Sequence, residues 1–163
     1  MRKKGQSDGL SVQGRFRVAI TEDGMIKGDS GFIENQVTNN GIRDYLVDHL
    51  LGESETNVDH AGLGTGGAVA SNTVDLPNTI DHRGNSSRLV ISASSALSGS
   101  NSARWTGAFA SNDFITTATT VGNIGLFAAS NRTVQDLFAG QSFTASTVAS
   151  NQAINFTYEI NFS

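Results

Sequence analysis

The sequence predicts a mainly β fold: an antiparallel β-sandwich, jelly-roll-like, with one α-helix and an N-terminal β-hairpin. Short segments that alternate apolar and polar residues recur along the chain, separated by Ser, Thr, Asn and Gly. A single segment near residue 45 instead has its apolar residues at helical spacing. The length of 163 residues fits one domain with a buried core. We therefore expect a basic arm over residues 1–9 and a single sandwich domain over residues 10–163.

The first alternating segment predicts a hairpin over residues 10–33. In "LSVQGRFRVAI", one face of a half-buried strand carries Val12, Gly14, Phe16, Val18 and Ile20. Asp23-Gly24 follows and is a strong two-residue turn signal, because both central positions of such a turn take a positive φ. A return strand is expected through residues 25–33.

The segment "TNNGIRDYLVDHLLG" predicts a helix over about residues 39–51. The residues at helical spacing are Ile42, Tyr45, Leu46, His49 and Leu50. Asn39 or Asn40 can cap its start, and Gly52 can take the left-handed position that ends it. Residues 53–87 are expected to form a loop, with a short extended piece near residues 74–76.

Residues 88–163 are expected to supply the strands of the sandwich. The strand-like segments read "SRLVISA", "ARWTGAFA", "ITTATTVGNIGLFA", "TVQDLFAG", "SFTASTV" and "QAINFTYEINFS". The last alternates most regularly, with aromatic and branched residues on one face and polar residues on the other. Such a pattern is typical of an antiparallel sheet that has one face in water.

Composition limits the possible partners. Only 16% of residues are charged, against roughly a quarter in a typical soluble domain, which suits a subunit packed beside copies of itself. The net charge of −4 argues against nucleic-acid binding by the whole domain. "RKK" at residues 2–4 is either a solvated terminus or part of an arm that grips an acidic neighbour or DNA. No apolar run has the length of a membrane helix or of a secretory signal, so no membrane contact is expected.

The stretch "HAGLGTGGAV", residues 60–69, matches the G-x-G-x-x-G pattern of dinucleotide-binding loops through its glycines at 62, 64 and 67. Such a loop needs a strand before it and a helix after it, so that amide N–H groups point at phosphate. Here a helix and a polar loop precede it, and the following "AVASNTVDLP" is too short and polar for a helix. We expect a junction between helix and sandwich, with no cofactor bound.

Asp-His pairs recur at residues 48–49, 59–60 and 81–82. A histidine with a carboxylate can bind zinc or relay protons, but a metal needs three or four converging donors and adjacent residues point in different directions. His49 is expected on the apolar side of the helix, and His60 and His82 in loops. The chain has no cysteine and no G-x-S-x-G segment. The sequence thus predicts no catalytic, cofactor-binding or metal-binding residues, and a protein that is not an enzyme.

Two groups of segments resemble small structural proteins of tailed bacteriophage particles. The first is "GRFRVAITEDGMIKGDSGFIENQVTNNGIRDYLVDHLLG", a hairpin and helix joined by an N-x-[VI]-T-x-x-G phrase. The second comprises Gly64-Thr65-Gly66, Ile124-Gly125-Leu126-Phe127, Leu137-Phe138-Ala139 and the terminal "INFTYEINFS". The resemblance spans most of residues 12–163, and its motifs mark no active site. Long fibres carry coiled coils or repeats, which this sequence lacks.

The resemblance implies a virion protein, assembled in the host cytoplasm, that binds copies of itself and the capsid, portal, neck or tail. The "IGLF…LFA" phrase favours the tail or neck apparatus. A capsid-decorating, or cement, protein of the head is the alternative. A function of another class is a glycan-binding module in which Trp105 stacks on sugar. We expect the N-terminal arm and the 53–87 loop to carry contacts between subunits.

Overall fold

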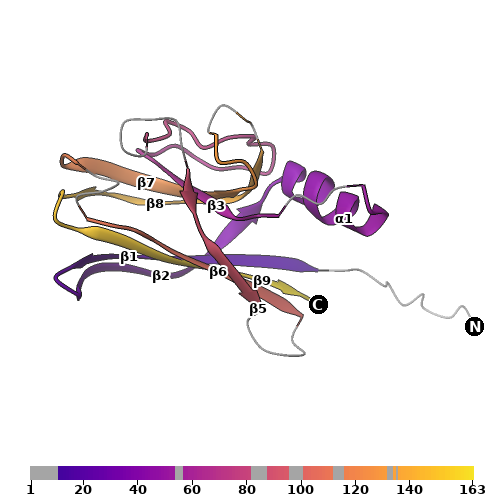
Figure 1. Ribbon diagram of the computed structural model, residues 1–163, viewed down its shortest axis with the longest axis horizontal. Helices are drawn as coiled ribbons and strands as arrows, with labels where there is room; N and C mark the ends of the chain where they lie inside the picture. The colour runs from indigo at the N-terminus through magenta and orange to yellow at the C-terminus, as the bar shows by residue number, and fades with distance from the viewer. Residues whose placement is uncertain are drawn as a thin grey trace, which may run out of the picture.

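The computed structural model describes residues 11–53, 57–81, 88–95, 101–111, 116–131, 134 and 136–163. The predicted arm over residues 1–9 and His82 lie outside these ranges. The described chain forms two antiparallel sheets that face each other, with a short helix at one end (Figure 1). This confirms the predicted mainly β, sandwich-type fold. In the described part of the chain, no helix combines the length and apolar character needed to cross a membrane.

Nine strands make up the two sheets, within the described ranges. Sheet A, the lower one in Figure 1, has the order β5-β6-β9-β1-β2 and sheet B has the order β4-β3-β7-β8. The strands of sheet A are β1 (Val12–Glu22), β2 (Met25–Val37), β5 (Ser92–Ser95), β6 (Ser102–Phe109) and β9 (Ala153–Phe162). Those of sheet B are β3 (His60–Gly64), β4 (Leu89–Val90), β7 (Thr119–Phe127) and β8 (Leu137–Val148).

Strand β2 belongs to both sheets. Most of its length pairs with β1, but its last residues, Gln36 and Val37, pair with Gly140 and Ala139 of β8. A strand that leaves one sheet for the other forms a closed corner of the sandwich. The chain continues from this corner directly into the helix, which therefore lies at the same end of the molecule (Figure 1).

The core lies between the sheets and follows the alternation seen in the sequence. From β1 it takes Phe16 and Val18, and from β9 it takes every second residue from Ile154 to Ile160. Tyr158 is the largest of these side chains, and its ring stacks on Phe16 with the centroids 4.5 Å apart. The prediction of β9 as a strand with one aromatic, branched inner face is confirmed.

Glu159 is buried although it faces away from the core. Arg15 and Arg104, from the strands on either side, each donate a hydrogen bond of 2.8 Å from Nε to its carboxylate. Burial alone would raise the pKa of Glu159, but these hydrogen bonds outweigh it and hold the pKa below its usual value. The two guanidinium groups thus tie β1, β9 and β6 together on the outer face of sheet A.

The β1–β2 hairpin turns where the sequence predicts. Asp23 and Gly24 both take a positive φ, 49° and 76°, as a two-residue turn of this type requires. Further along, the pairing shifts register between Arg17 and Ala19. At this bulge Arg17 donates hydrogen bonds to Asp29, and the Ser30 hydroxyl accepts one from the Val18 amide.

The helical segment differs from the prediction in winding and in its cap. A π-helical turn, η1 (Gly41–Val47), precedes a single α-helical turn, α1 (Asp48–Leu51). Thr38, rather than Asn39 or Asn40, accepts the hydrogen bond from the first amide of η1 on its side-chain oxygen. Thr38 is preferred because its hydroxyl is buried at the sheet corner and also donates to the Leu137 carbonyl. Gly52 ends the helix with a φ of 71°, as predicted.

The expectation that residues 53–87 form a loop is wrong for residues 60–64, which form β3. This strand pairs with β4 on one side and β7 on the other, and Ala61 and Leu63 are fully buried. It has no apolar–polar alternation because both of its faces are covered. Residues 61–64 are therefore inside the protein and do not contribute to the intersubunit surface expected of the loop.

The Arg17–Asp29 pair makes stability depend on pH. Hydrogen bonds from Arg17 and from the Gly31 amide lower the pKa of Asp29 from its ordinary value near 4 to about 2. A carboxyl whose pKa is lowered by folding adds stability above pH 4 and loses it as the pH falls toward 2. Asp29→Asn should therefore lower the free energy of unfolding at pH 7 and have little effect at pH 2, as measured by urea denaturation. An equal loss at both pH values would contradict this role for the charge.

Candidate functional site

The glycine-rich stretch at residues 60–69 is part of sheet B. Gly62 and Gly64 pair with Gly125 and Asn123 of β7. Beyond the strand, the Thr65 amide donates to the Asn78 carbonyl, and the Val69 amide donates to the Ser142 hydroxyl. These amides therefore bind protein groups. They do not form the open cradle of N–H groups that a phosphate requires.

The glycines allow a close crossing of chain segments. Residues 78–80 run antiparallel beside the end of β3, with Thr79 opposite Gly64 and the Ile80 amide donating to the Leu63 carbonyl at 2.8 Å. A Cβ atom on Gly64 would lie 2.2 Å from Oδ1 of Asn123 and 2.6 Å from the carbonyl oxygen of Pro77. The predicted junction between helix and sandwich is thus corrected to a buried strand whose glycines leave room for a second layer of backbone.

The Asp-His pairs at residues 48–49 and 59–60 lie on different elements. His60 is the first residue of β3 rather than part of a loop, and its Nδ1 hydrogen-bonds to its neighbour Asp59. His49 is exposed on α1. His49 is therefore not the core or boundary histidine expected from the helical pattern, because α1 extends beyond the sandwich. Among the described residues, no group of three or more His, Cys, Asp or Glu side chains is placed to hold a metal ion.

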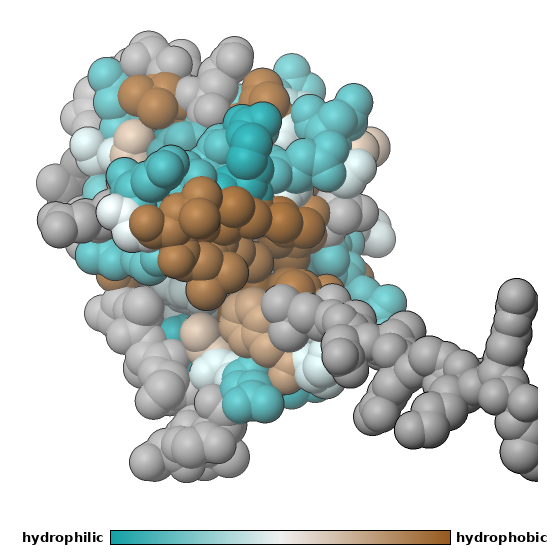
Figure 2. Space-filling view, turned by 90° about the vertical axis from the view of Figure 1, so that its right-hand side faces the viewer, coloured by the Kyte–Doolittle hydropathy of each residue, from teal (hydrophilic) through white to brown (hydrophobic). Residues whose placement is uncertain are grey.

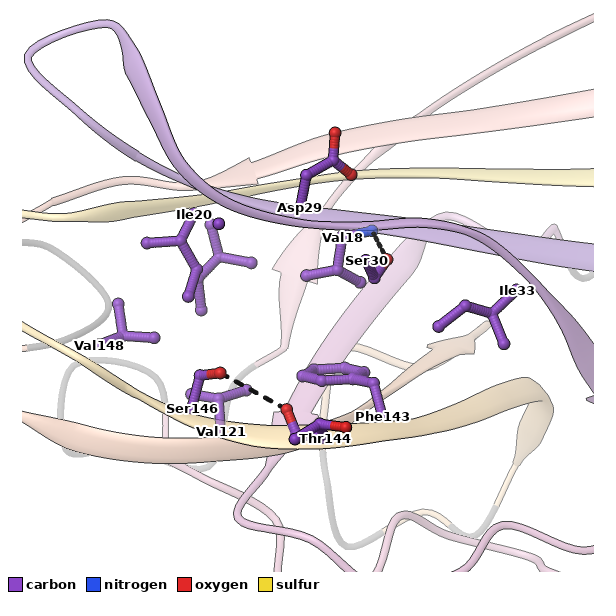
Figure 3. Close-up of a pocket in the computed structure, with 12 residues that line it drawn as sticks. Val18, Ile20, Asp29, Ser30, Ile33, Val121, Phe143, Thr144, Ser146 and Val148 are labelled. Atoms are coloured by element: carbon purple, nitrogen blue, oxygen red, sulfur yellow. Dashed lines mark hydrogen bonds between the residues drawn. The ribbon is translucent and has the colours of Figure 1, made fainter.

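A hollow of about 290 Å³ lies between the sheets where β2 and β8 diverge (Figure 3). Its apolar wall residues are Val18, Ile20, Ile33, Val121, Phe143, Val148 and Ile154, beside the hydroxyls of Ser30, Thr144 and Ser146. Both strands are bulged here, with register shifts opposite residues 17–19 and 121–123. Bulges at a sheet edge oppose pairing with another strand, so this opening does not present a regular edge to a partner.

The larger hollow is a groove of about 600 Å³ between the helix and the end of the sandwich. It is lined by Tyr45, Leu46, His49, Leu50, Asn57, Val58, Ala103, Trp105, Phe138, Ile160 and Phe162. The lining comes from the helix, the segment before β3, and strands β6, β8 and β9. None of these described lining residues is Asp, Glu, Lys or Arg. We call this groove, with the exposed apolar residues of the helix, the helix-end face.

The helix adds large apolar side chains to this face that the domain leaves in water. The exposed fraction is 86% for Leu50 and 64% for Leu51, and Ile42 and Val47 are also exposed. Viewed from this end, the surface shows a contiguous apolar area (Figure 2). A contiguous apolar patch of this kind is typical of a protein–protein contact or a binding groove.

Trp105 forms part of the floor of the groove. Its indole Nε1 donates a 2.8 Å hydrogen bond to the Val58 carbonyl. Its ring lies against Tyr158 and Phe138, with centroids 5.4 and 5.9 Å away. The side chain is half-buried, and the contacts with the other rings hold its orientation.

The helix-end face was not predicted from the sequence. The spacing of Ile42, Tyr45 and Leu50 suggests one stripe that faces the core, but only Tyr45 of these is buried. A signal was nevertheless present: Val47 and Leu51 fall on the opposite side of the helix from that stripe, at 100° per residue. A short helix with apolar residues on two sides needs cover on both.

A buried arginine positions the helix and the loops of sheet B. The Arg88 side chain is 1% exposed, and its terminal nitrogens donate to the Asp136 and Asp75 carboxylates and to the Ala129 and Val134 carbonyls. Asp136 also accepts the Tyr45 hydroxyl on its backbone carbonyl, at 2.6 Å. Burial raises the pKa of Tyr45, so the phenol remains a neutral donor that fixes the helix against the sandwich.

Substitution at Gly64 tests the close crossing. Gly64→Val should lower the free energy of unfolding by about 1–3 kcal/mol or prevent folding, because the side chain has no space beside Asn123 and Pro77. Gly28→Ala in β2 is the control, since its added Cβ would meet only Ile20, at 3.9 Å. Thermal and urea unfolding measure both. Equal stability of the two variants would contradict the crossing.

Substitution at Arg88 tests the buried network. Arg88→Met should cost about 1–3 kcal/mol, because it takes a hydrogen-bond donor from the partly buried carboxylates of Asp75 and Asp136 and from two carbonyls. Arg43→Met, which removes an exposed pair with Asp44, should cost less than about 1 kcal/mol. Urea denaturation of both variants gives the comparison, and a loss at Arg88 no larger than that at Arg43 would contradict the assignment.

Comparisons of the chain with protein-family models, with curated proteins and with solved structures found no match. Function is therefore inferred from the chain's own features: the helix-end face, the low charge, and the segments that resemble phage structural proteins.

Proposed function

We propose that this chain is a structural subunit of a tailed bacteriophage particle, which binds copies of itself and neighbouring virion proteins. The observation that carries the proposal is the helix-end face: an uncharged groove bordered by leucines that the domain leaves in water. A stable protein contact buries about 800 Å² per partner and has an apolar, charge-poor centre. The face has that chemistry.

The charge content of the chain supports the same proposal. Only 16% of the residues are charged, and some of these charges neutralise each other within the chain, as Glu159 does with Arg15 and Arg104. When a surface is buried against another subunit, removing water from hydroxyl and amide groups costs less free energy than removing it from charged groups. The virion assignment itself rests on the resemblance of the segments at residues 14–52 and 124–163.

Within the particle, we propose a position in the tail or neck, on the strength of Ile124–Phe127 and Leu137–Ala139. In the structure these motifs are the ends of β7 and β8 that flank the connection held by Arg88. Decoration of the capsid is the alternative. Copy number separates the two, because a closed ring gives roughly 3, 6 or 12 copies, whereas a head-surface protein is present in far larger numbers.

The proposal is tested on particles of the phage whose genome encodes the chain. Antibodies against the recombinant protein should label purified particles in immunogold electron microscopy, at the tail or neck. Quantitative mass spectrometry of the same particles gives the copy number. Particles without the protein would overturn the proposal, and dense labelling of the head would replace the tail position with capsid decoration.

The N-terminal arm has a separate test. Deletion of residues 2–9 should reduce incorporation into particles several-fold while the far-ultraviolet circular dichroism and melting temperature stay unchanged, because these residues precede the first strand. Replacement of Arg2, Lys3 and Lys4 by Gln is the matched control for charge. Normal incorporation of the deletion variant would refute the role of the arm and leave the virion proposal standing.

A further inference from the structure

We infer that the helix-end face binds a second copy of this chain across a twofold axis, so that Leu50 and Leu51 of each copy occupy the groove of the other. The inference rests on the proposed function in one respect: it takes this face as a surface for assembly. It adds the identity of the partner and the symmetry of the contact.

The first support is that the projecting leucines and the groove that would receive them lie on the same face. Leu50 stands at the rim of the groove with 86% of its surface in water, and Leu51 is its immediate neighbour. In a twofold contact the same patch of each subunit meets itself, so a projection and a hollow that lie side by side can fill each other reciprocally. Figure 2 shows a continuous apolar area on this side of the molecule.

The second support is the helix. Together η1 and α1 span residues 41–51, shorter than the roughly 12–15 residues at which isolated helices become marginally stable. Contacts with the rest of the protein must therefore stabilise the helix, yet Tyr45 is the only large apolar side chain of the helix that is buried. A second copy seated against the groove would add contacts to Leu50, which lines the groove and is 86% exposed.

The third support is the chemistry of the groove walls. The Tyr45 hydroxyl donates to the Asp136 carbonyl, and the Trp105 indole donates to the Val58 carbonyl. These two groups already have partners, so the polar side chains they leave in the described lining are His49 and Asn57, at its edge toward the helix and the segment before β3. The described lining residues include no Asp, Glu, Lys or Arg, so the groove favours aliphatic side chains over a charged segment.

Arg43 of η1, next to the face, is already paired within the chain. Arg43 donates a 2.8 Å hydrogen bond to the carboxylate of its neighbour Asp44. The pair is neutral as a unit, so an identical helix can approach without burying an isolated guanidinium group.

The experiment is sedimentation velocity on the full chain over a range of concentrations. The wild-type protein should form a dimer, and the double variant Leu50→Asp, Leu51→Asp should be monomeric. The dissociation constant should rise at least about 100-fold, because each aspartate would be buried without a partner. Circular dichroism and melting of the monomeric form should be unchanged, since both leucines are exposed in the single chain. Met25→Asp, Ile26→Asp at the hairpin tip is the matched control, with 59% of each side chain exposed, and should remain dimeric.

The single tryptophan of the chain gives a second measurement. Since Trp105 lies in the groove, its emission should shift to shorter wavelength, and its quenching by acrylamide should fall, as the wild-type protein is concentrated. The leucine double variant should show neither change. This readout reports on the groove itself.

Three outcomes overturn the inference: a protein that is monomeric at every concentration, a dimer that survives the leucine substitutions, or an assembly without twofold symmetry. A dimer lost on deletion of residues 2–9 but not with the leucine variant also overturns it, because the arm would then be the occupant. If antibodies label the particles but the purified protein is monomeric, the dimer is refuted and the virion proposal stands. If the protein forms a dimer that depends on the two leucines but is absent from particles, the virion proposal is refuted and the dimer stands.

Discussion

The buried guanidinium of Arg88 is the interaction on which the rest of the sheet B side depends. Its carbon Cζ lies 3.4 Å from the centre of the Phe127 ring, and its terminal nitrogens satisfy carboxylates and carbonyls from three chain segments. A charge held in this way is costly to bury and costly to leave unpaired, so those segments have one arrangement that satisfies it. Through Asp136 the same arrangement fixes Tyr45, and with it the helix and the groove that the helix borders.

In sheet B, glycines determine how closely a second segment of the chain can approach a strand. At Gly64 and Gly67 a second layer of chain passes within contact distance, with Pro77 against both. Side chains on β3 would hold that layer away and expose Leu76, which is now buried. The residues that resemble a phosphate-binding loop thus serve to bring two backbones together. The two uses share one physical property, the absence of a Cβ, which explains why the pattern alone does not separate them.

The sequence predicts best those strands that have one face in water and the other in the core. In β1 and β9, alternation from Phe16 to Val18 and from Ile154 to Ile160 reports burial directly. Strand β3 has two covered faces and no alternation, so its pairing was missed. For the helix, spacing identified the apolar stripe, but how far the sandwich reaches along it depends on where β8 and β9 end. The candidate site therefore depends on tertiary geometry, and the signal for it in the sequence is the pair Val47 and Leu51, which lie off the apolar stripe of the helix.

Strand β1 pairs with β9 along almost its whole length, from Val12 opposite Phe162 to Thr21 opposite Ala153. This pairing determines when, during synthesis of the chain, the domain can complete its fold. The first strand pairs early with β2 of the hairpin but finds its second neighbour only after the last strand has left the ribosome. The groove, whose lining includes Ile160 and Phe162, does not exist until then. A nascent chain cannot present a finished helix-end face before the whole domain has been translated. The topology thereby ties completion of this apolar surface to completion of the fold.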